Sequence, residues 1–513
     1  MQRRLPRFGG FERGAVVLAG VALVVFALIV WLGGAPVAWL LLGFCGVTSA
    51  AAFAIQLRHG RFFEPLTVIA GFALISLSAR ALQLFIGAKD LLSYYPTADP
   101  TDEYLRIETS ETAQFATELL KQPLEPSLTR AIGAVAIFIA LVVVGYLLPW
   151  GPRLGEHLGR VGRRVTRPPN LRALVVACLA IAAVGQVRLL VHVGGPGEAL
   201  DTSFRHSVLR GGLVDHFLIG FGVVALLIWM AWSPPRSTRA RVAFALATLE
   251  MCAFFAIAGS RTRVVLLLAM LAIVVHYLWR RWRPLELAGA LVVVVLFATA
   301  LLGVRQATSD KTTGEALGSA PTYLERPEGI LNDLNEFDYL FEATTVIGSS
   351  DRYHRPAEFQ YGNGFWQAVH PFVPGAIDSG KPESRDQEFR KIIWGNKQGE
   401  GRPYTIIGDF WNDFGFAGVI VGSLLFGLFS RALLGLVAAT PGRPGREFRV
   451  ILYSMALTLV YIAVSTTYSV TVGFLVIFGL PLLLALFAVR PAVDWMAARL
   501  GRRARARERA PIG

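Results

Sequence analysis

The 513-residue sequence contains few cysteines and few charged residues. Its three cysteines, Cys45, Cys178 and Cys252, all lie within apolar stretches, which excludes a disulfide framework and a cysteine-based zinc site. Charged residues make up 17% of the chain, against about 25% in soluble domains. Hydrophobic residues make up 54% and the mean hydropathy is +0.51. This composition argues against a soluble enzyme and indicates a polytopic membrane protein.

Motifs that bind nucleotides or metals are also missing. The sequence has no Rossmann or P-loop glycine pattern, and its predicted outer loops contain no convincing Asp-x-Asp metal motif. We therefore expect neither a cofactor nor a metal site. The first outer loop consists of little more than Gly34 and Ala35, which counts against a dolichol-type transferase, because such enzymes usually carry an acidic motif there.

Long apolar runs predict about twelve membrane-spanning helices, counted in windows of roughly 17 to 25 residues. The expected spans are 14–33, 36–56, 65–88, 131–150, 172–194, 213–233, 241–259, 264–279, 285–303, 405–431, 449–467 and 470–490. The predicted fold class is an all-α polytopic membrane protein. The spans divide the chain into a bundle (1–303), a large outer loop (304–404), three further spans (405–490) and a basic tail (491–513).

The net charge of +14 would suggest nucleic acid in a soluble protein, but here its position along the chain predicts orientation. With the N-terminus inside, every inner connection is basic. These connections are 56–61, 152–172, 233–241, 279–284, 442–449 and 501–509. We therefore expect both termini in the cytoplasm and no nucleic-acid partner. The arginine-rich tail is expected to be disordered and to lie on the anionic inner leaflet, in contact with membrane lipids.

The large loop, 304–404, is predicted to lie outside the membrane. Acidic residues slightly outnumber Lys and Arg within it, so it is no polybasic arm. Aromatic and apolar clusters at 337–348, 365–377 and 389–395 predict an ordered cap with short helices. A loop of this length is usually functional or disordered.

Charged residues at membrane depth are the best indication of function, because each is costly unless paired or hydrated. Arginines from several spans, and from the short outer loop before the sixth span, are expected near the outer leaflet: Arg80, Arg188, Arg205, Arg210, Arg261 and Arg263. His192 shares a helix face with Arg188, and Asp215 and His216 open the sixth span. Guanidinium groups bind phosphate oxygens in pairs, so this set suits a diphosphate. Alternatively, these arginines extend to the phosphate groups of membrane lipids. Glu250, near mid-span, is a counter-ion to Arg80 or a proton carrier.

Three motifs occur around the large loop in a fixed order. They are GSR (259–261), YGNGFWQAVHPFVPGAIDSGKP (361–382) and YTIIGDFWNDFGFAGVIVGSLLFGL (404–428). Together they resemble the O-antigen polymerases of the Wzy type and the related O-antigen ligases. The sequence departs from the family pattern at Pro374-Gly375, where the family often has Pro-Arg followed by Trp-Pro. The resemblance covers about residues 240 to 430.

The resemblance implies a GT-C-like glycosyltransferase that is inverting and metal-independent. It would join oligosaccharide units carried on polyprenyl diphosphate at the outer face of a bacterial plasma membrane. Its partners would be these lipid-linked glycans, with a flippase and a chain-length regulator as further candidates. The nearest alternative is ligase-type transfer of the glycan to another acceptor. A twelve-span secondary transporter is a more distant one, and would be expected to show inverted repeats and broken helices.

Arg261 is the first catalytic candidate, because it would hold the diphosphate and stabilise the charge that develops on it. Candidates for the base that activates the acceptor hydroxyl are His354, His370 and Asp409. Asp409 is also a good helix cap, and single histidines more often pack than catalyse. The substrate-binding candidates are Arg80, Arg188, Arg205, Arg210, Arg263, Arg352, Arg355, Lys381, Tyr404 and Asn412.

Overall fold

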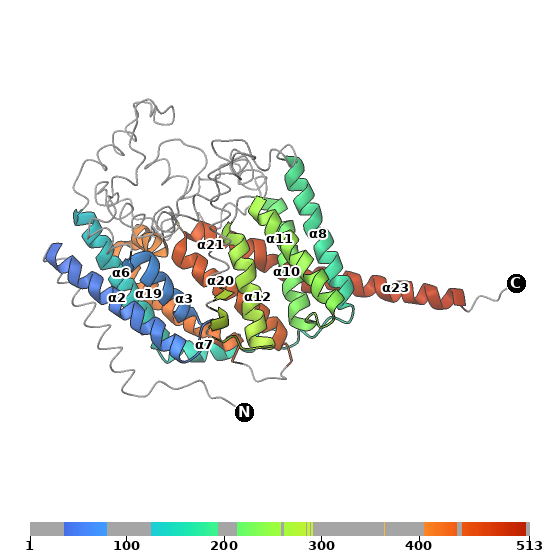
Figure 1. Cartoon of the computed structure of the whole chain (residues 1–513), viewed down its shortest axis with the longest axis horizontal. Coiled ribbons are helices and arrows are strands. Elements are labelled where there is room, and N and C mark those ends of the chain that lie inside the picture. The colour runs from blue at the N-terminus through green and yellow to red at the C-terminus, as the bar shows by residue number, and fades with distance from the viewer. Residues whose placement is uncertain are drawn as a thin grey trace, which may run out of the picture. The chain divides into compact units, whose positions relative to one another are not determined.

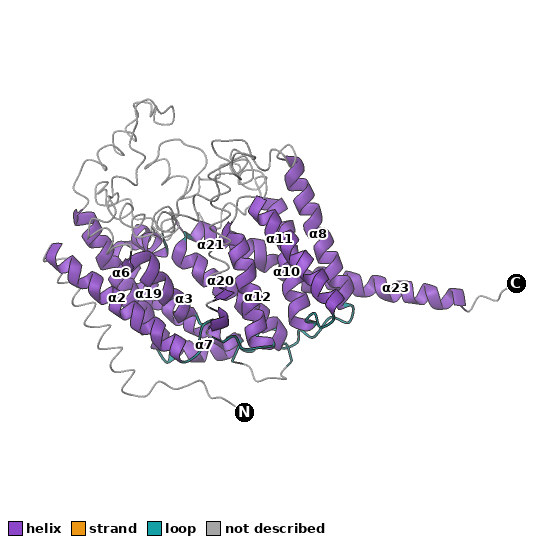
Figure 2. Ribbon diagram, viewed as in Figure 1, coloured by secondary structure: helices purple, strands orange, loops and turns teal. Residues whose placement is uncertain are grey.

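The computed structural model of the protein is helical, with no strand among the residues that it describes (Figures 1 and 2). The described residues are 35–79, 125–192, 213–257, 261–283, 285–287, 289–290, 364, 405–438 and 444–508. The predicted spans 14–33 and most of 285–303 lie outside them, as does the predicted outer loop 304–404 except Gly364.

Six helices in the described part of the chain are long and apolar enough to cross a membrane. They comprise Arg130–Leu147, Leu171–His192, Val214–Trp232, Ile406–Leu436, Arg446–Ser465 and Val470–Arg499. Thr262–Leu278 is a shorter apolar helix. An all-α membrane protein is therefore the right class. The count of twelve spans and the loop with short helices remain predictions.

The chain forms two compact units. Unit 1 comprises 1–159, 332–438 and 459–473, and unit 2 comprises 160–331, 439–458 and 474–513. The helices of unit 1 are α2 (Ala35–Arg58), α3 (Pro65–Phe72), the π-helical η1 (Ala73–Ala79), α6 (Glu125–Leu147), α7 (Trp150–Leu158), α19 (Ile406–Leu433) and the short η8 (Leu434–Leu436). Helix α21 (Tyr468–Phe474) begins in unit 1, and α20 (Arg446–Ser465) contributes to both units.

Glycines allow α6 and α19 of unit 1 to approach closely. Gly427 of α19 faces the backbone of Val142, and Gly145 of α6 faces the backbone of Leu424, with no room for a side chain at either position. Small residues let membrane helices pack at short range, because lipid supplies little hydrophobic force between them. Helix α7 continues this contact, since a Cβ on Gly155 would lie 3.0 Å from the carbonyl oxygen of Ala432.

A polar cluster joins three helices of unit 1 at the end where α6 stops. The Tyr146 hydroxyl donates to Glu64 Oε2 over 3.1 Å, and the Arg431 guanidinium lies 5.1 Å from the centre of the Tyr146 ring. Arg61 Nε lies 3.8 Å from Glu64 Oε1. Burial raises the pKa of the Glu64 carboxyl, which immediately precedes α3, and Arg61 opposes this shift. We call Arg61, Glu64, Tyr146 and Arg431 the unit 1 cluster.

Unit 2 is built around α8 and α10. Its helices are α8 (Leu171–His192), α10 (Leu213–Trp232), α11 (Thr238–Ile257), α12 (Arg261–Leu278), the π-helical η9 (Leu475–Gly479), α22 (Leu480–Leu484), the π-helical η10 (Ala485–Val489) and α23 (Arg490–Glu508). Gly185 of α8 lets α10 approach closely, since a Cβ there would lie 2.9 Å from the Asp215 carbonyl oxygen. The predicted spans match α8 and α10 within two residues at each end.

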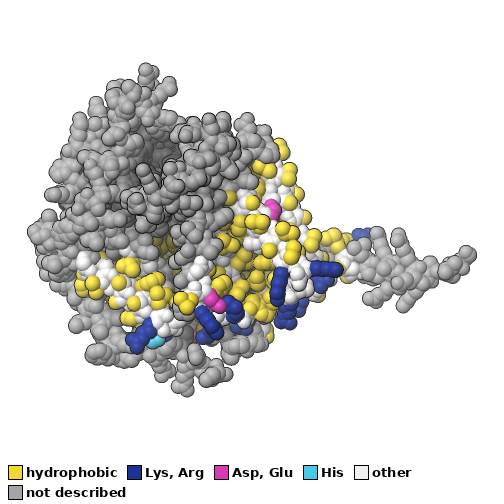
Figure 3. All heavy atoms as spheres, viewed as in Figure 1, with side chains coloured by type: hydrophobic (Ala, Val, Ile, Leu, Met, Phe, Trp, Pro, Cys, Tyr) yellow, Lys and Arg dark blue, Asp and Glu magenta, His cyan; other side chains and the backbone are white. Residues whose placement is uncertain are grey.

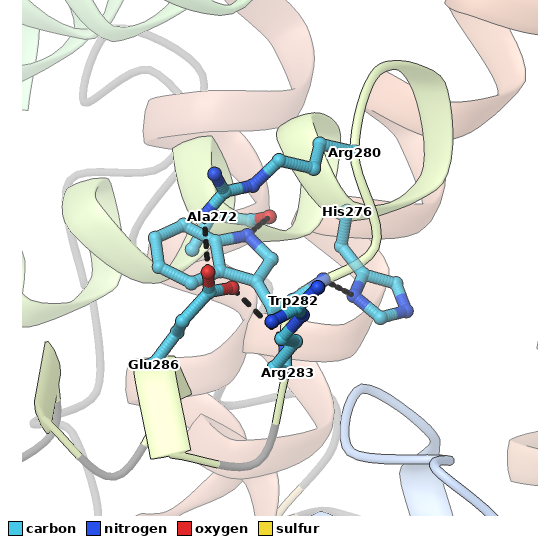
Figure 4. Close-up of polar contacts among 6 residues, drawn as sticks. All are labelled: Ala272, His276, Arg280, Trp282, Arg283 and Glu286. Atoms are coloured by element: carbon cyan, nitrogen blue, oxygen red, sulfur yellow. Dashed lines mark hydrogen bonds and ion pairs between the residues drawn. The ribbon is translucent and has the colours of Figure 1, made fainter.

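The turn after α12 is held by hydrogen bonds (Figure 4). Trp282 Nε1 donates to the carbonyl oxygen of Ala272 over 3.2 Å, and the Trp282 backbone N–H donates to His276 Nδ1 over 3.2 Å. Glu286 accepts from Arg280 Nη2 at 2.8 Å and from the Arg283 backbone N–H at 3.0 Å. A glutamate that bonds back to the N–H three residues earlier is a capping pattern. Glu286 therefore fixes the start of the following helix.

Arginines mark the end of unit 2 at which this turn lies. Trp279 Nε1 donates to the Met230 carbonyl oxygen over 2.9 Å, which joins the end of α10 to the turn. Figure 3 shows dark-blue Lys and Arg side chains along the lower border of the apolar surface of α10, α11 and α12. Exposed arginines in these connections include Arg163, Arg164, Arg167, Arg172, Arg239, Arg241 and Arg280. Their clustering agrees with the predicted orientation, although the side of the membrane stays a prediction.

The basic C-terminal segment is helical, so the expectation of a disordered tail is wrong as far as Glu508. Helix α23 begins at Arg490 and ends at Glu508, and it extends beyond the other helices of unit 2 (Figure 1). Its alanines, arginines and leucines are among the best helix formers. The Arg499 guanidinium also lies 5.2 Å from the centre of the Trp495 ring, one turn earlier. Local propensity therefore outweighs charge repulsion in this segment.

Candidate functional site

The structure describes a minority of the predicted site residues. Those that lie outside the described residues are Arg80, Arg205, Arg210, Arg352, His354, Arg355, His370, Lys381 and Tyr404. Arg261 begins α12, and its backbone therefore lies in the same helical turn as Arg263, but its side chain is not described. Arg188, Arg263, Asp409 and Asn412 are described with their side chains.

Arg188 and His192 are both held by one buried carboxylate, that of Asp215. Arg188 Nε donates to Asp215 Oδ1 over 2.8 Å, and His192 Nδ1 lies 3.1 Å from Asp215 Oδ2. The Asp215 side chain is 1% exposed, whereas those of Arg188 and His192 are 51% and 54% exposed. Residues four apart share a helix face, and a carboxylate is favoured in the first turn of a helix such as α10. Asp215 is thus buried, whereas the side chains of its two partners are about half exposed.

Arg263 of α12 contacts His216, the residue of α10 that follows Asp215. Its Nη1 lies 2.9 Å from His216 Nδ1. Because an arginine can only donate, His216 Nδ1 must accept, and the imidazole proton is assigned to Nε2. His216 is therefore neutral in this arrangement, and Arg263 keeps its positive charge.

These contacts bring together the ends of three apolar helices: the last turn of α8 and the first turns of α10 and α12. We call Arg188, His192, Asp215, His216 and Arg263 the unit 2 cluster. With neutral histidines, two arginines against one aspartate leave a net positive charge. The N-termini of α10 and α12 add roughly half a positive charge each, and the C-terminus of α8 offsets one of these two contributions. This end of unit 2 is therefore suited to an anion.

The sequence predicts that Asp215 and His216 begin the sixth span, but it does not identify them as site residues. One signal was present in the sequence: an aspartate in the first turn of an apolar helix is expensive without a cationic partner. Which arginine pairs with it depends on the packing of α8 against α10, and sequence spacing does not reveal this packing.

Asp409 and Asp413 lie in unit 1 and bind backbone groups. Asp409 Oδ2 accepts from the Tyr468 N–H over 2.7 Å, and Asp413 Oδ1 accepts from the Gly364 N–H over 3.3 Å. Both side chains are less than 5% exposed. Asp409 therefore caps the start of α21, which is the structural role that its residue type allows. Asn412, between them, is half-buried.

Helix α19 breaks just after these acids. Phe414 has φ −145° and ψ 17°, and Gly415 has φ 60° and ψ −145°, so the helical path is interrupted within Ile406–Leu433. A positive φ favours glycine, which has no Cβ to clash with the backbone. The break separates the polar start of α19 from its apolar remainder.

Two further predictions concern Glu250 and metals. The Glu250 side chain is exposed on α11, and its expected partner Arg80 lies outside the described residues. Within the described ranges, no group of three His, Cys, Asp or Glu side chains is arranged to hold a metal ion. The prediction of a metal-independent site is not tested by this observation.

Comparison with known proteins provides no family assignment. No family model, curated protein or solved structure matches the chain.

Proposed function

We propose that the protein is a glycan polymerase that joins polyprenyl-diphosphate-linked oligosaccharide units at the extracytoplasmic face of the membrane. Two arginines, Arg188 and Arg263, are held at the same end of three apolar helices, and this observation carries the proposal. A diphosphate whose lipid tail lies in the membrane carries its charge at the membrane surface, where apolar helices end. The motif resemblance at 259–261, 361–382 and 404–428 supplies the reaction class.

Arg261, with Arg263 and Arg188, would bind the donor diphosphate and stabilise its charge as the glycosidic bond breaks. Asp215 occupies Nε of Arg188, which leaves the two terminal nitrogens of this half-exposed guanidinium for phosphate oxygens. The acceptor hydroxyl attacks the anomeric carbon from the opposite face, so the configuration inverts. The lipid diphosphate departs with the bonding electron pair.

The test is polymer formation by the purified full-length protein in lipid nanodiscs. The substrate is the pool of polyprenyl-diphosphate glycans extracted from source cells that lack this chain. Wild-type protein should convert this pool into a ladder on a gel. Arg261→Ala should abolish the ladder, and Arg261→Lys should restore little of it, because a point charge does not replace a bidentate fork.

Arg172→Ala is the matched control, because Arg172 is an exposed arginine near the start of α8, the end opposite His192. Its ladder should match that of the wild type. A full ladder from Arg261→Ala would contradict the proposed role of this arginine. Transfer of glycan only to an acceptor without a lipid diphosphate would identify a ligase instead.

The break in α19 favours a second candidate, a secondary transporter. Transporters often use discontinuous helices at their substrate sites, and Asp409 and Asp413 are buried beside the Phe414–Gly415 break. In this chain, however, both carboxylates accept backbone hydrogen bonds. A transporter would form no ladder in the nanodisc assay, where both faces share one solution.

A further inference from the structure

The His192 imidazole contacts a carboxylate through one ring nitrogen, and its side chain is more than half exposed. Its Nδ1 lies 3.1 Å from Asp215 Oδ2, and the side chain is 54% exposed. Asp215 also accepts from a guanidinium, so its carboxylate is ionised and can only accept. The proton of a neutral His192 therefore resides on Nδ1, and the lone pair is on Nε2. A carboxylate that fixes the tautomer of an exposed imidazole is the arrangement of a general base.

Arg188 places an anion-binding group beside this imidazole. Arg188 and His192 are four residues apart on α8, so their Cβ atoms are about 5–6 Å apart. This spacing has the scale of one sugar ring. A diphosphate on Arg188 and a hydroxyl at His192 Nε2 can therefore flank a single anomeric carbon. Asp215 bridges the two groups, because each of its oxygens binds one of them.

The other described candidates for a base are less suited. Asp409 is 4% exposed and its Oδ2 is occupied by the Tyr468 N–H. His216 is 6% exposed and its Nδ1 faces Arg263. His192 combines a carboxylate partner with a side chain that is more than half exposed, as neither of these two residues does.

From this geometry we infer that His192 is the general base of the glycan transfer and that Asp215 is the residue that positions it. The inference rests on the proposed function. His192 Nε2 takes the proton of the acceptor hydroxyl as its oxygen forms the new bond to the anomeric carbon. The bond from that carbon to the diphosphate breaks, and its electron pair leaves with the diphosphate. The imidazolium then releases the proton to water.

Charged groups from α8, α10 and α12 lie around the proposed base. Asp215 of α10 and Arg188 of α8 are the charged groups beside the His192 imidazole. His216 and Arg263 form the adjacent pair from α10 and α12. Because the base must be neutral, kcat/KM should rise with pH as His192 loses its proton.

The experiment compares His192→Gln with the wild type in the nanodisc assay. We expect kcat to fall at least about 100-fold, the usual contribution of a general base, and the acidic limb of the pH profile to disappear. The Kd for undecaprenyl diphosphate should stay unchanged. His157→Gln, which changes an exposed histidine of α7, is the matched control and should behave as the wild type.

Asp215→Asn tests the positioning role. An amide that donates to Nδ1 would place the imidazole proton on Nε2, so kcat should fall by about 10²- to 10⁴-fold. A shifted acidic limb in the residual activity would separate this effect from a general loss of structure. His192 is more than half exposed, so its glutamine variant should fold even if Asp215→Asn does not.

The outcomes distinguish the inference from the function on which it rests. If wild-type protein forms no polymer, the proposed function fails. If wild-type protein polymerises and His192→Gln keeps a kcat within a few-fold, or keeps the acidic limb, His192 is not the base and the function stands. Loss of undecaprenyl diphosphate binding by His192→Gln would make His192 a binding residue and overturn the inference.

Discussion

The two units carry polar clusters of similar composition that differ in exposure. The unit 1 cluster buries its tyrosine completely and stacks an arginine on it. The unit 2 cluster buries Asp215 and His216 and leaves Arg188 and His192 about half exposed. Charges that contact only protein hold helices together, whereas charges with free hydrogen-bonding capacity at a surface can bind a ligand. The difference predicts a structural role for unit 1 and a binding role for unit 2.

The strongest test of this comparison is one arginine from each cluster. Arg188→Ala should weaken binding of undecaprenyl diphosphate about 10- to 100-fold, since a charged hydrogen bond contributes about 1.5–3 kcal/mol. This change also takes the cationic partner from the buried Asp215, so the Kd is measured on the folded fraction. Arg431→Ala should leave the Kd unchanged and lower stability by about 2 kcal/mol, through lost packing on Gly151 and the Tyr146 ring.

An unchanged Kd for Arg188→Ala, together with loss of binding by Arg431→Ala, would overturn the comparison. The Kd can be measured by titration of the purified protein in nanodiscs, and stability by denaturant unfolding of the same preparation in mixed micelles.

A smaller effect is expected for Tyr146→Phe. This change removes only the hydroxyl that donates to Glu64, and it keeps the ring that faces Arg431. Because Glu64 retains Arg61 and is 13% exposed, the cost should be about 1 kcal/mol. Glycan polymerisation per folded molecule should equal that of the wild type. Reduced turnover at full stability would show that the unit 1 cluster takes part in the reaction.

The smallest effect concerns the pH dependence of stability. Burial raises the pKa of Glu64 above its unfolded value, so the folded state binds more protons between the two values. The free energy of unfolding should therefore fall as pH rises from about 4.3 through the raised pKa. Glu64→Gln should flatten this slope in unfolding experiments at several pH values. An unchanged slope would mean that Glu64 is not its source.

Sequence patterns predicted α8 and α10 of unit 2 well, whereas the helical α23 of the same unit was expected to be disordered. The spans 172–194 and 213–233 correspond to α8 and α10 because a membrane helix must be continuous and apolar to satisfy its backbone groups. The same reasoning missed α7, which lies within a segment treated as an inner connection. It also missed the break in α19, since a glycine in a membrane helix does not reveal its own φ angle.

The candidate site was predictable only as a set of residue types. Arginines at the predicted outer ends of spans were visible as costly charges, and Arg188 and Arg263 belong to the unit 2 cluster. Asp215 as the shared partner of Arg188 and His192 was not predictable, because the pairing depends on how α8 and α10 pack. Asp409 was expected as either a base or a cap, and its bond to the Tyr468 N–H supports the cap.

By itself, the sequence determined that this is an all-α membrane protein, where several of its helices lie and where its basic connections are. These properties follow from local composition, because the sequence itself contains the hydrophobic length of each helix and the charges beside it. Only the tertiary structure decided which charges neutralise one another and which remain open. That choice depends on distances between helices far apart in sequence. Burial then distinguishes Asp215 from the half-exposed side chain of His192.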